Sequence, residues 1–294
     1  MFFSFRIRRR VGIICSVVLA LLIVVLTLQK AVATEVPEGS VPLPIIMYHS
    51  LLKDSSRQGQ YVISPDLLES DIKYLKEQGY TTVDMQDLID YVYNGVPLPL
   101  KPIMLTFDDG YYNNYLYAYP LMKQYGFKMV LSPIGFFTEQ YTQSSDKNPN
   151  YSHCSWQDLK EMADSGLVEI QNHTYNMHTY NKTRKGSKRV NGEPLEKYTS
   201  VLTSDVSKLQ IDLTNKIGIT PNTFTYPFGA VSKESLPILK KLGFQATLTC
   251  NSHINYITKE KDCLYGLGRY LRPSGLDSRS YFRNTVKLCE TGGK

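Results

Sequence analysis

The feature that most constrains the fold is an alternation of short apolar segments with amphipathic segments, which runs from about residue 43 to residue 290. The apolar segments have the length and flanking turn residues of β-strands, and the amphipathic segments carry helix start and stop signals. Strands that alternate with helices over such a span predict a parallel α/β protein, most simply a βα barrel.

The individual elements follow from the apolar runs and from local capping signals. Strands are expected at residues 43–48, 81–83, 102–107, 128–133, 167–171, 223–226, 245–249 and 264–270. Helices are expected at residues 65–78, 85–93, 111–125, 155–164, 203–217 and 232–242, and after Asp277. Side-chain oxygens that can cap helices mark five of the helix starts: Ser64, Asp84, Ser155, Ser232 and Asp277.

The N-terminal 34 residues are expected to be a membrane address. A basic flank, Arg6–Arg10, precedes the unbroken apolar run Val11–Leu28. A cationic flank before such a run predicts that the N-terminus stays in the cytoplasm and that the rest is exported. The run is long enough for a spanning signal anchor, which we favour, whereas Ala31–Ala33 offers a cleavage site for a signal peptide. Residues 35–42 are expected to be a linker and residues 43–294 one domain.

The charge of the chain gives no reason to expect a nucleic-acid partner. Residues 1–34 hold five of the basic residues and no acid, so they account for nearly all of the net charge of +6. A run at residues 182–189 has five basic residues but no interleaved aromatic ones, which single-stranded nucleic acids favour. This run is either a solvated loop or a surface that attracts an anionic wall polymer or lipid headgroups.

Four cysteines of the exported part, Cys154, Cys250, Cys263 and Cys289, face a compartment that permits disulfides. A Cys250–Cys263 bridge, which closes a short loop, and isolated buried thiols are the two alternatives. The sequence does not choose between them.

Residues that could bind a ligand or take part in catalysis lie just past the ends of four expected strands. They are His49, the pair Asp108-Asp109, His173 and the segment Pro227–Gly229. The carboxyl ends of parallel strands meet at one rim of a barrel, which is where catalytic loops gather. We therefore expect these residues to form one site.

Two histidines and a carboxylate of this group suit a metal ion. His173 and His178 would point about 140° apart on a regular helix, so they converge only if the segment is a loop. With Asp109 they form a set that suits Zn²⁺, with Fe²⁺, Co²⁺ or Ni²⁺ as alternatives. Asp108 would then face a water molecule. The alternative is an Asp-Gly turn in which one aspartate caps the next helix.

These residues give the chain a family resemblance over about residues 43–275. It resembles the polysaccharide deacetylases of carbohydrate esterase family four, the nodulation-deacetylase type of domain. Thr106–Gly110 is similar to the T-F-D-D-G motif of that family, and His173–His178 resembles its H-[ST]-x-x-H motif with one extra residue. That longer spacing and Met47-Tyr48-His49 are similar to the poly-N-acetylglucosamine deacetylase branch. Tyr226–Gly229 resembles the third motif, R-x-P-[YF]-G, without its arginine.

The resemblance implies a distorted βα barrel with fewer than eight repeats and a metal-dependent hydrolysis of N-acetyl groups on a glycan. Asp109, His173 and His178 would hold the divalent metal, and Asp108 would be the general base. The segment Tyr226, Pro227, Phe228 and Gly229 would contact the substrate, and a backbone N–H near Phe228 would help to hold the oxyanion. The expected substrate is an acetylated glycan: poly-N-acetylglucosamine first, then peptidoglycan or chitin-like oligomers.

Two departures from the family pattern leave roles to be filled. Thr225 stands near the position of the missing arginine, so either Arg269 or Arg272 orients the base from another part of the rim, or both are solvated arginines. The family's late L-x-H motif has no clean match, because His253 lies in the right region without the leucine spacing. His49 is therefore a candidate for the acid or for a substrate contact. A glycan-binding protein without activity and a barrel glycoside hydrolase are the alternative functions.

Overall fold

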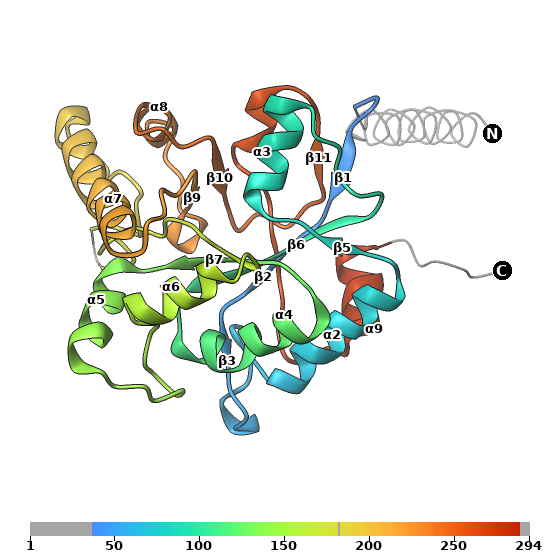
Figure 1. The fold of residues 1–294 in the computed structure, drawn as a ribbon. Helices are drawn as coiled ribbons and strands as arrows, with labels where there is room; N and C mark the ends of the chain where they lie inside the picture. Colours follow the sequence, from blue (N-terminus) through green and yellow to red (C-terminus); the bar gives the residue numbers. More distant parts are fainter. Residues whose placement is uncertain (1–36, 182, 289–294) are drawn as a thin grey trace, which may run out of the picture. The chain divides into compact units, whose positions relative to one another are not determined.

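Parallel strands form the centre of the structure, a computed structural model that describes residues 37–181 and 183–288 (Figure 1). The main sheet has the order β12-β2-β6-β7-β8, with β5 also paired to β6, and all its pairings are parallel. The predicted parallel α/β class is thereby confirmed. The strands are β2 (Ile45–Tyr48), β5 (Thr81–Thr82), β6 (Pro102–Asp109), β7 (Met129–Pro133), β8 (Val168–Ile170) and β12 (Tyr270–Leu271).

A second parallel pair continues this arrangement. It consists of β9 (Thr223–Thr225) and β10 (Ala246–Leu248). An isolated parallel bridge joins Asn172, just after β8, to Phe224 of β9, and another joins Leu248 of β10 to Leu267. The pairing thus runs from β8 through β9 and β10 to the segment that enters β12. All these strands therefore present their carboxyl ends to a common rim.

Helices cover both sides of the main sheet, with α2, α4 and α6 opposite α3 (Figure 1). The longer ones are α2 (Pro65–Glu77), α3 (Met85–Asn94), α4 (Tyr119–Tyr125), α5 (Gly135–Ser144), α6 (Trp156–Asp164), α7 (Leu195–Ile217) and α8 (Ser235–Lys241). The short helical segments are Ser55–Arg57, Asn114–Ala118, Pro227–Gly229, Lys261–Leu264, α9 (Ser278–Ser280) and Tyr281–Val286.

The core follows the two-residue alternation of the strands, because successive side chains leave a strand on opposite sides. Ile46 and Leu105 pack in one buried cluster with residues of α2, α4 and α6. Their neighbours Ile45 and Met104 pack in another with residues of α3 and β10. A third cluster joins α7 and α8 to β9 around Phe224. Helix packing on both sides of the sheet explains why the strands read as continuous apolar runs.

Local capping signals located most helix starts. The hydroxyl of Ser64 accepts a hydrogen bond from Leu67 N, and Asp84 and Ser155 each form a reciprocal capping box. The hydroxyl of Ser232 instead accepts a hydrogen bond from Arg189 N, and α8 begins at Ser235 without a side-chain cap. Ser232 was therefore wrong as a helix cap, since a loop distant in sequence takes its oxygen.

Several expected elements differ in extent. Helix α5 was not expected, and no side chain caps its N-terminus. Helix α7 begins at Leu195, eight residues before the expected start. The strand expected at residues 264–270 is reduced to β12, because Leu264 ends a 3₁₀ turn and packs in the α3 cluster. An apolar run by itself does not separate a strand from other buried backbone.

Four short strands were also not foreseen as separate elements. They are β1 (Val41–Leu43), which pairs antiparallel with β11 (Asn255–Ile257), and β3 (Ser50–Leu51), which pairs with β4 (Val62–Ile63). Strand β1 begins inside the expected linker of residues 35–42, because its partner strand supplies the hydrogen bonds that hold it extended.

One expectation concerns the N-terminal segment. The predicted signal segment, residues 1–34, lies outside the described residues. Within residues 37–181 and 183–288, no helix is both long and apolar enough to cross a membrane.

Cys154, Cys250 and Cys263 are free thiols, so the Cys250–Cys263 bridge does not form. Cys250 instead packs beside Met47 and Arg269.

Candidate active site

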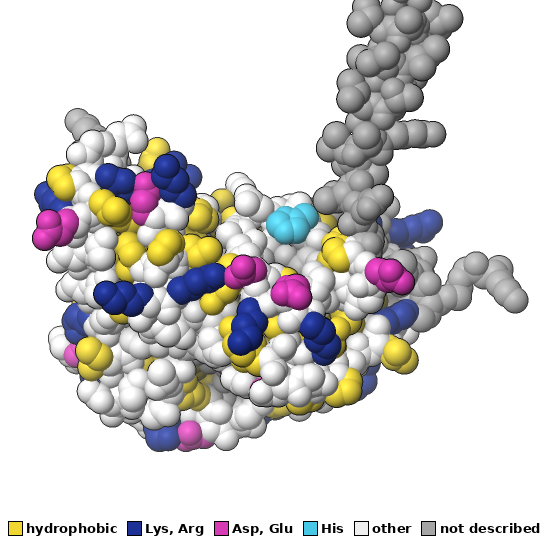
Figure 2. Space-filling model, turned by 90° about the horizontal axis from the view of Figure 1, so that it is seen from above, with side chains coloured by type: hydrophobic (Ala, Val, Ile, Leu, Met, Phe, Trp, Pro, Cys, Tyr) yellow, Lys and Arg dark blue, Asp and Glu magenta, His cyan; other side chains and the backbone are white. Residues whose placement is uncertain are grey.

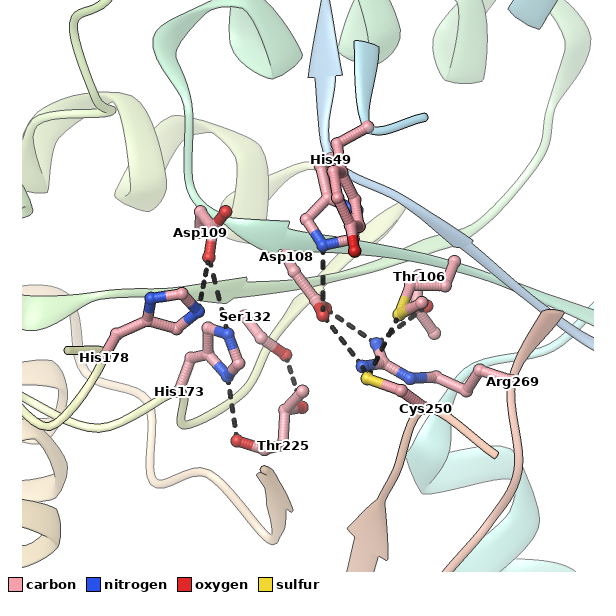
Figure 3. A network of polar contacts seen from close by, with 12 residues as sticks. His49, Thr106, Asp108, Asp109, Ser132, His173, His178, Thr225, Cys250 and Arg269 are labelled. Atoms are coloured by element: carbon pink, nitrogen blue, oxygen red, sulfur yellow. Dashed lines mark hydrogen bonds and ion pairs between the residues drawn. The ribbon is translucent and has the colours of Figure 1, made fainter. Parts of the chain in front are cut away.

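Strand β6 delivers its two consecutive aspartates to different partners. Thr106 and Asp108 lie two residues apart on the strand, so their side chains share one side of it. Both contact the guanidinium of Arg269 (Figure 3). Asp109 has a left-handed backbone with φ 69°, and its carboxylate lies beside His173 and His178 instead. Neither aspartate caps the following helical segment, which has Asn113 at its N-cap. The capping alternative is thus wrong.

Gly110 explains why glycine follows the aspartate pair. It has φ 75°, and a Cβ on it would lie 2.7 Å from Pro133 Cβ at the end of β7. No side chain fits in that space, so a larger residue would push β6 and β7 apart. The T-F-D-D-G segment thus combines two reactive carboxylates with a close approach of two strands.

The histidine segment is a loop, as convergence of the two rings required. Its residues 171–178 contain no helix, and Thr174 adopts φ 72°. The carboxylate of Asp205, on α7, accepts hydrogen bonds of 2.8 Å from both Tyr175 N and Asn176 N. This carboxylate fixes the backbone between the two histidines. It was missed from the sequence, because nothing local marks a helix residue as a partner of a loop thirty residues away.

The three proposed metal ligands come together. The carboxylate Oδ1 of Asp109 lies 3.5 Å from Nε2 of His173 and 3.3 Å from Nε2 of His178. The three ligand atoms lie within 4.8 Å of one another. Asp109 Oδ1 is buried without a hydrogen-bond partner in the described structure. A buried carboxylate oxygen that faces two imidazole nitrogens, without a hydrogen bond, is what a divalent cation would satisfy.

A hydrogen bond behind His173 orients it toward the same point. Its Nδ1 lies 2.8 Å from the carbonyl oxygen of Thr225. A carbonyl oxygen only accepts, so Nδ1 carries a proton, and in the neutral imidazole the lone pair is then on Nε2, where a metal would bind. Thr225, near the position of the missing motif arginine, thus contributes through its backbone. Its hydroxyl lies 2.8 Å from that of Ser132 on β7 (Figure 3).

Arg269 is the arginine that pairs with Asp108. Its Nη1 donates to Asp108 Oδ1 at 2.7 Å and its Nη2 to Asp108 Oδ2 at 2.8 Å, and both side chains are buried. Such a bidentate pair fixes the plane of the carboxylate as well as its charge. Arg272 forms the same kind of pair with Asp71, away from the site, and Tyr48 donates to that carboxylate. Of the two candidates, Arg269 orients Asp108.

His49 lies beside Asp108 at the end of β2 (Figure 3). Its Nε2 is 4.0 Å from Asp108 Oδ2, and its Nδ1 is buried without a hydrogen-bond partner. The ring of Tyr61, on the segment between β3 and β4, lies edge-on to it with 5.0 Å between centroids. Both rings line the cavity of about 550 Å³ that also contains Asp108 and the metal ligands.

The corner at residues 226–229 contributes one side chain to the cavity. Phe228 lines it, has φ 57°, and lies 4.3 Å from the ring of His178. Tyr226 and Pro227 are buried, and the hydroxyl of Tyr226 bonds with Ser235. Gly229 packs against Cys250, where a Cβ would lie 2.8 Å from Cys250 Cβ. Tyr226 therefore supports the corner and does not stack on a sugar.

His253, in the region of the family's late histidine motif, is not part of the cavity. His253 is exposed and packs against Gly268, where an added Cβ would lie 2.3 Å from its ring. The cavity lining does not include it. Apart from the two histidines of the metal set, His49 is the imidazole nearest to Asp108.

The electrostatics of the site favour ionised carboxylates. Burial opposes ionisation of Asp108, but the charges of Arg269 and His173 outweigh it and lower the pKa of Asp108. Burial likewise opposes ionisation of Asp109, whose pKa the neighbouring histidines lower. Burial lowers the pKa of His49, against the opposing effect of Asp108. Burial and the charge of His173 lower the pKa of His178 to about 4, so its imidazole is neutral and available as a ligand.

Replacing Asp205 with alanine is expected to weaken metal binding about 10- to 100-fold, as loss of a residue that orients ligands typically does. The two backbone N–H groups between the histidines would lose their acceptor, and the loop would lose its conformation. Titration of the purified chain with Zn²⁺ measures the change. Asp212→Ala, on the same helix and in an ion pair with Lys208, is the matched control. Equal affinity of both variants would show that the loop holds its shape without Asp205.

Comparison with known proteins gives a consistent match. The family model described as polysaccharide deacetylase matches residues 95–247, just over half of the chain. The poly-beta-1,6-N-acetyl-D-glucosamine N-deacetylase of Escherichia coli O157:H7 is 25% identical over an alignment of 245 residues that covers 76% of this chain and 36% of that protein. The chain thus spans about a third of that relative. The protein of the same name from Staphylococcus aureus (strain MRSA252) is 27% identical over 68% of this chain and 67% of its own length.

A solved structure agrees with the sequence comparison. The de-N-acetylase from Aggregatibacter actinomycetemcomitans superposes with a TM-score of 0.70 and 28% identity, over 84% of this chain and 99% of that one. His49 and Arg269 both lie outside the residues that the family model matches. The tertiary structure is therefore what joins these two side chains to Asp108.

Proposed function

Because the chain belongs to the polysaccharide deacetylase family, we propose that it is a metal-dependent enzyme that removes N-acetyl groups from N-acetylglucosamine units of a cell-surface or cell-wall glycan. The observation that carries this proposal is the adjacent placement of two units: the Asp109, His173 and His178 set and the Asp108–Arg269 pair. The names of the relatives support poly-N-acetylglucosamine as the first substrate to test. Peptidoglycan and chitin-like oligomers are the next.

The first role in the proposed reaction belongs to the metal set. Asp109, His173 and His178 would hold a divalent cation, for which we propose Zn²⁺ with Co²⁺, Ni²⁺ and Fe²⁺ as alternatives. Such a cation supplies polarisation of the acetamide carbonyl and a lower pKa for water at the site. Three protein ligands would leave coordination positions open for the acetamide oxygen and for the water, as catalytic metal sites do.

Asp108 acts as the general base. It stays ionised because of Arg269, and it takes a proton from the attacking water. His49 then delivers a proton to the departing amine nitrogen. It lies 4.0 Å from Asp108, so the proton that Asp108 took up passes to it through one intervening water molecule. The carbon–nitrogen bond breaks, and the products are acetate and a sugar with a free amine. The backbone and the ring of the Phe228 corner contact the substrate. A backbone N–H near Phe228 helps to hold the oxyanion that forms when water attacks the acetamide carbonyl.

We further propose that the catalytic part works outside the cytoplasmic membrane, anchored or released according to the fate of residues 1–34. The ring of strand pairings described above supports interpretation of the domain as a distorted βα barrel with fewer than eight repeats.

The test is acetate release from N-acetylglucosamine oligomers by the full chain, with Zn²⁺, Co²⁺ or Ni²⁺ added, and with or without a chelator. We expect the chelator to reduce the rate at least about a hundredfold, because the cation supplies several kcal/mol of transition-state stabilisation. Asp109→Ala should lose activity with every metal, whereas Asp164→Ala, an exposed aspartate on α6, should not. If β-1,6- and β-1,4-linked oligomers and peptidoglycan all yield no acetate although metal is bound, the chain is a glycan-binding protein.

A further inference from the structure

One lysine of the basic run reaches the cavity of the metal set. Lys185 lines this cavity together with Phe228, His178 and Asp108. It is the only lysine in the lining and is exposed to solvent. The proposed reaction gives it no role, and neither do the motifs that identify the family.

The backbone around Lys185 is fixed against the rim. Lys185 and Tyr180 form an antiparallel bridge, and Gly186 N donates to Thr179 O at 2.9 Å. Gly186 has φ 54°, and a Cβ on it would lie 2.8 Å from Pro227 O. Only glycine permits this approach. The lysine therefore projects from a segment that is clamped onto the Phe228 corner, directly beside the metal ligand His178.

The charge of Lys185 is not neutralised within the described structure. Arg184 of the same run pairs with Glu193, and Arg189 pairs with Glu234. Lys185 has no ion pair among residues 37–181 and 183–288, and its ammonium lies 5.8 Å from the centre of the Tyr180 ring. Asp108 is paired with Arg269, and Asp109 faces the His173 and His178 rings. Within the described residues, Lys185 is therefore a positive charge on this side of the cavity that no carboxylate pairs with.

We infer that Lys185 is a specificity-determining residue that selects, by charge, the sugar next to the one being deacetylated. This inference rests on the proposed function. Deacetylation converts a neutral acetamide into an amine that is protonated at neutral pH. A glucosamine cation bound beside Lys185 is repelled, whereas a neutral N-acetylglucosamine is not. The enzyme therefore favours targets whose neighbour is still acetylated and leaves its products spaced along the polymer.

The test compares two tetramers of equal length, one fully acetylated and one with a single glucosamine next to the target sugar. We expect the full chain to show kcat/KM values about 3- to 10-fold higher on the acetylated tetramer, as like charges several ångströms apart in a solvated site imply. Lys185→Gln should bring this ratio close to one, and Lys185→Glu should reverse it. Lys185→Arg, which keeps the charge, should preserve it.

Lys188→Gln is the matched control, since Lys188 is an exposed lysine of the same run that does not line the cavity. It should keep the wild-type ratio. The ratio should also shrink at high salt, which screens exposed charges. A wild-type ratio near one, or an unchanged ratio in Lys185→Gln, overturns the inference. Lack of acetate release from the fully acetylated tetramer would instead contradict the proposed function, so the two failures are distinct.

Discussion

Asparagine in place of Asp108 is expected to reduce acetate release by about a thousandfold or more, while the chain still binds its metal. General-base catalysis alone contributes about 10²–10⁴-fold. The amide keeps the shape of the carboxylate but cannot accept the proton of the attacking water. Arg269 would in addition lose its charged partner in a buried setting. The measurement is kcat/KM on acetylated oligomers beside a zinc titration of the same preparation.

Asp164→Asn is the control for the chemical change, because that aspartate is exposed on α6 and pairs with Lys160. It should retain wild-type activity. Full activity of Asp108→Asn with metal bound would show that another group is the base. Loss of both activity and metal would instead show that Asp108 belongs to the metal site.

Replacing Arg269 with methionine is expected to cost about 3–5 kcal/mol of unfolding free energy, because it leaves the Asp108 carboxylate buried and unpaired. Denaturant unfolding measures this change. Where the variant remains folded, its activity should depend differently on pH. Arg269 is the largest influence that keeps the pKa of Asp108 low against the effect of burial.

The sign of that change follows from the role of the carboxylate. The base works only when ionised, so activity falls at acid pH as Asp108 takes up a proton. Without Arg269 the effect of burial predominates and the pKa of Asp108 rises. The acid limb of kcat/KM against pH should therefore move to higher pH in Arg269→Met. Arg269→Lys should show a smaller shift than Arg269→Met, since lysine supplies the charge without the bidentate geometry. If the acid limb lies at the same pH in all three proteins, Arg269 does not set the pKa of the catalytic base.

Much of the site was predictable because its residues are local in sequence. The proposed metal ligands and the proposed base lie in two short segments, Thr106–Gly110 and His173–His178, at or just past the ends of buried strands. Strand ends are recognisable from apolar runs, and parallel strands bring their ends to one rim. The same locality made the capping boxes at Asp84 and Ser155 predictable.

Other features depend on pairs of residues far apart in the chain. Asp205 holds the histidine loop across thirty residues, and Arg269 reaches Asp108 across 161 residues. Ser232 illustrates the reverse case, because Arg189 takes the oxygen that local pattern assigned to a helix cap. No periodicity or spacing encodes such partners.

The sequence by itself thus determined the parallel α/β class and located the proposed metal ligands and the adjacent proposed base, because strand periodicity and strand-end chemistry are local. Only the tertiary structure decided that Arg269 and not Arg272 holds Asp108, that His49 faces the site while His253 does not, and that Lys185 enters the cavity. These choices depend on which side chains the folded chain brings within a few ångströms of each other. Burial and charge complementarity fix that selection when the chain packs, as in the Arg269–Asp108 and Arg272–Asp71 pairs.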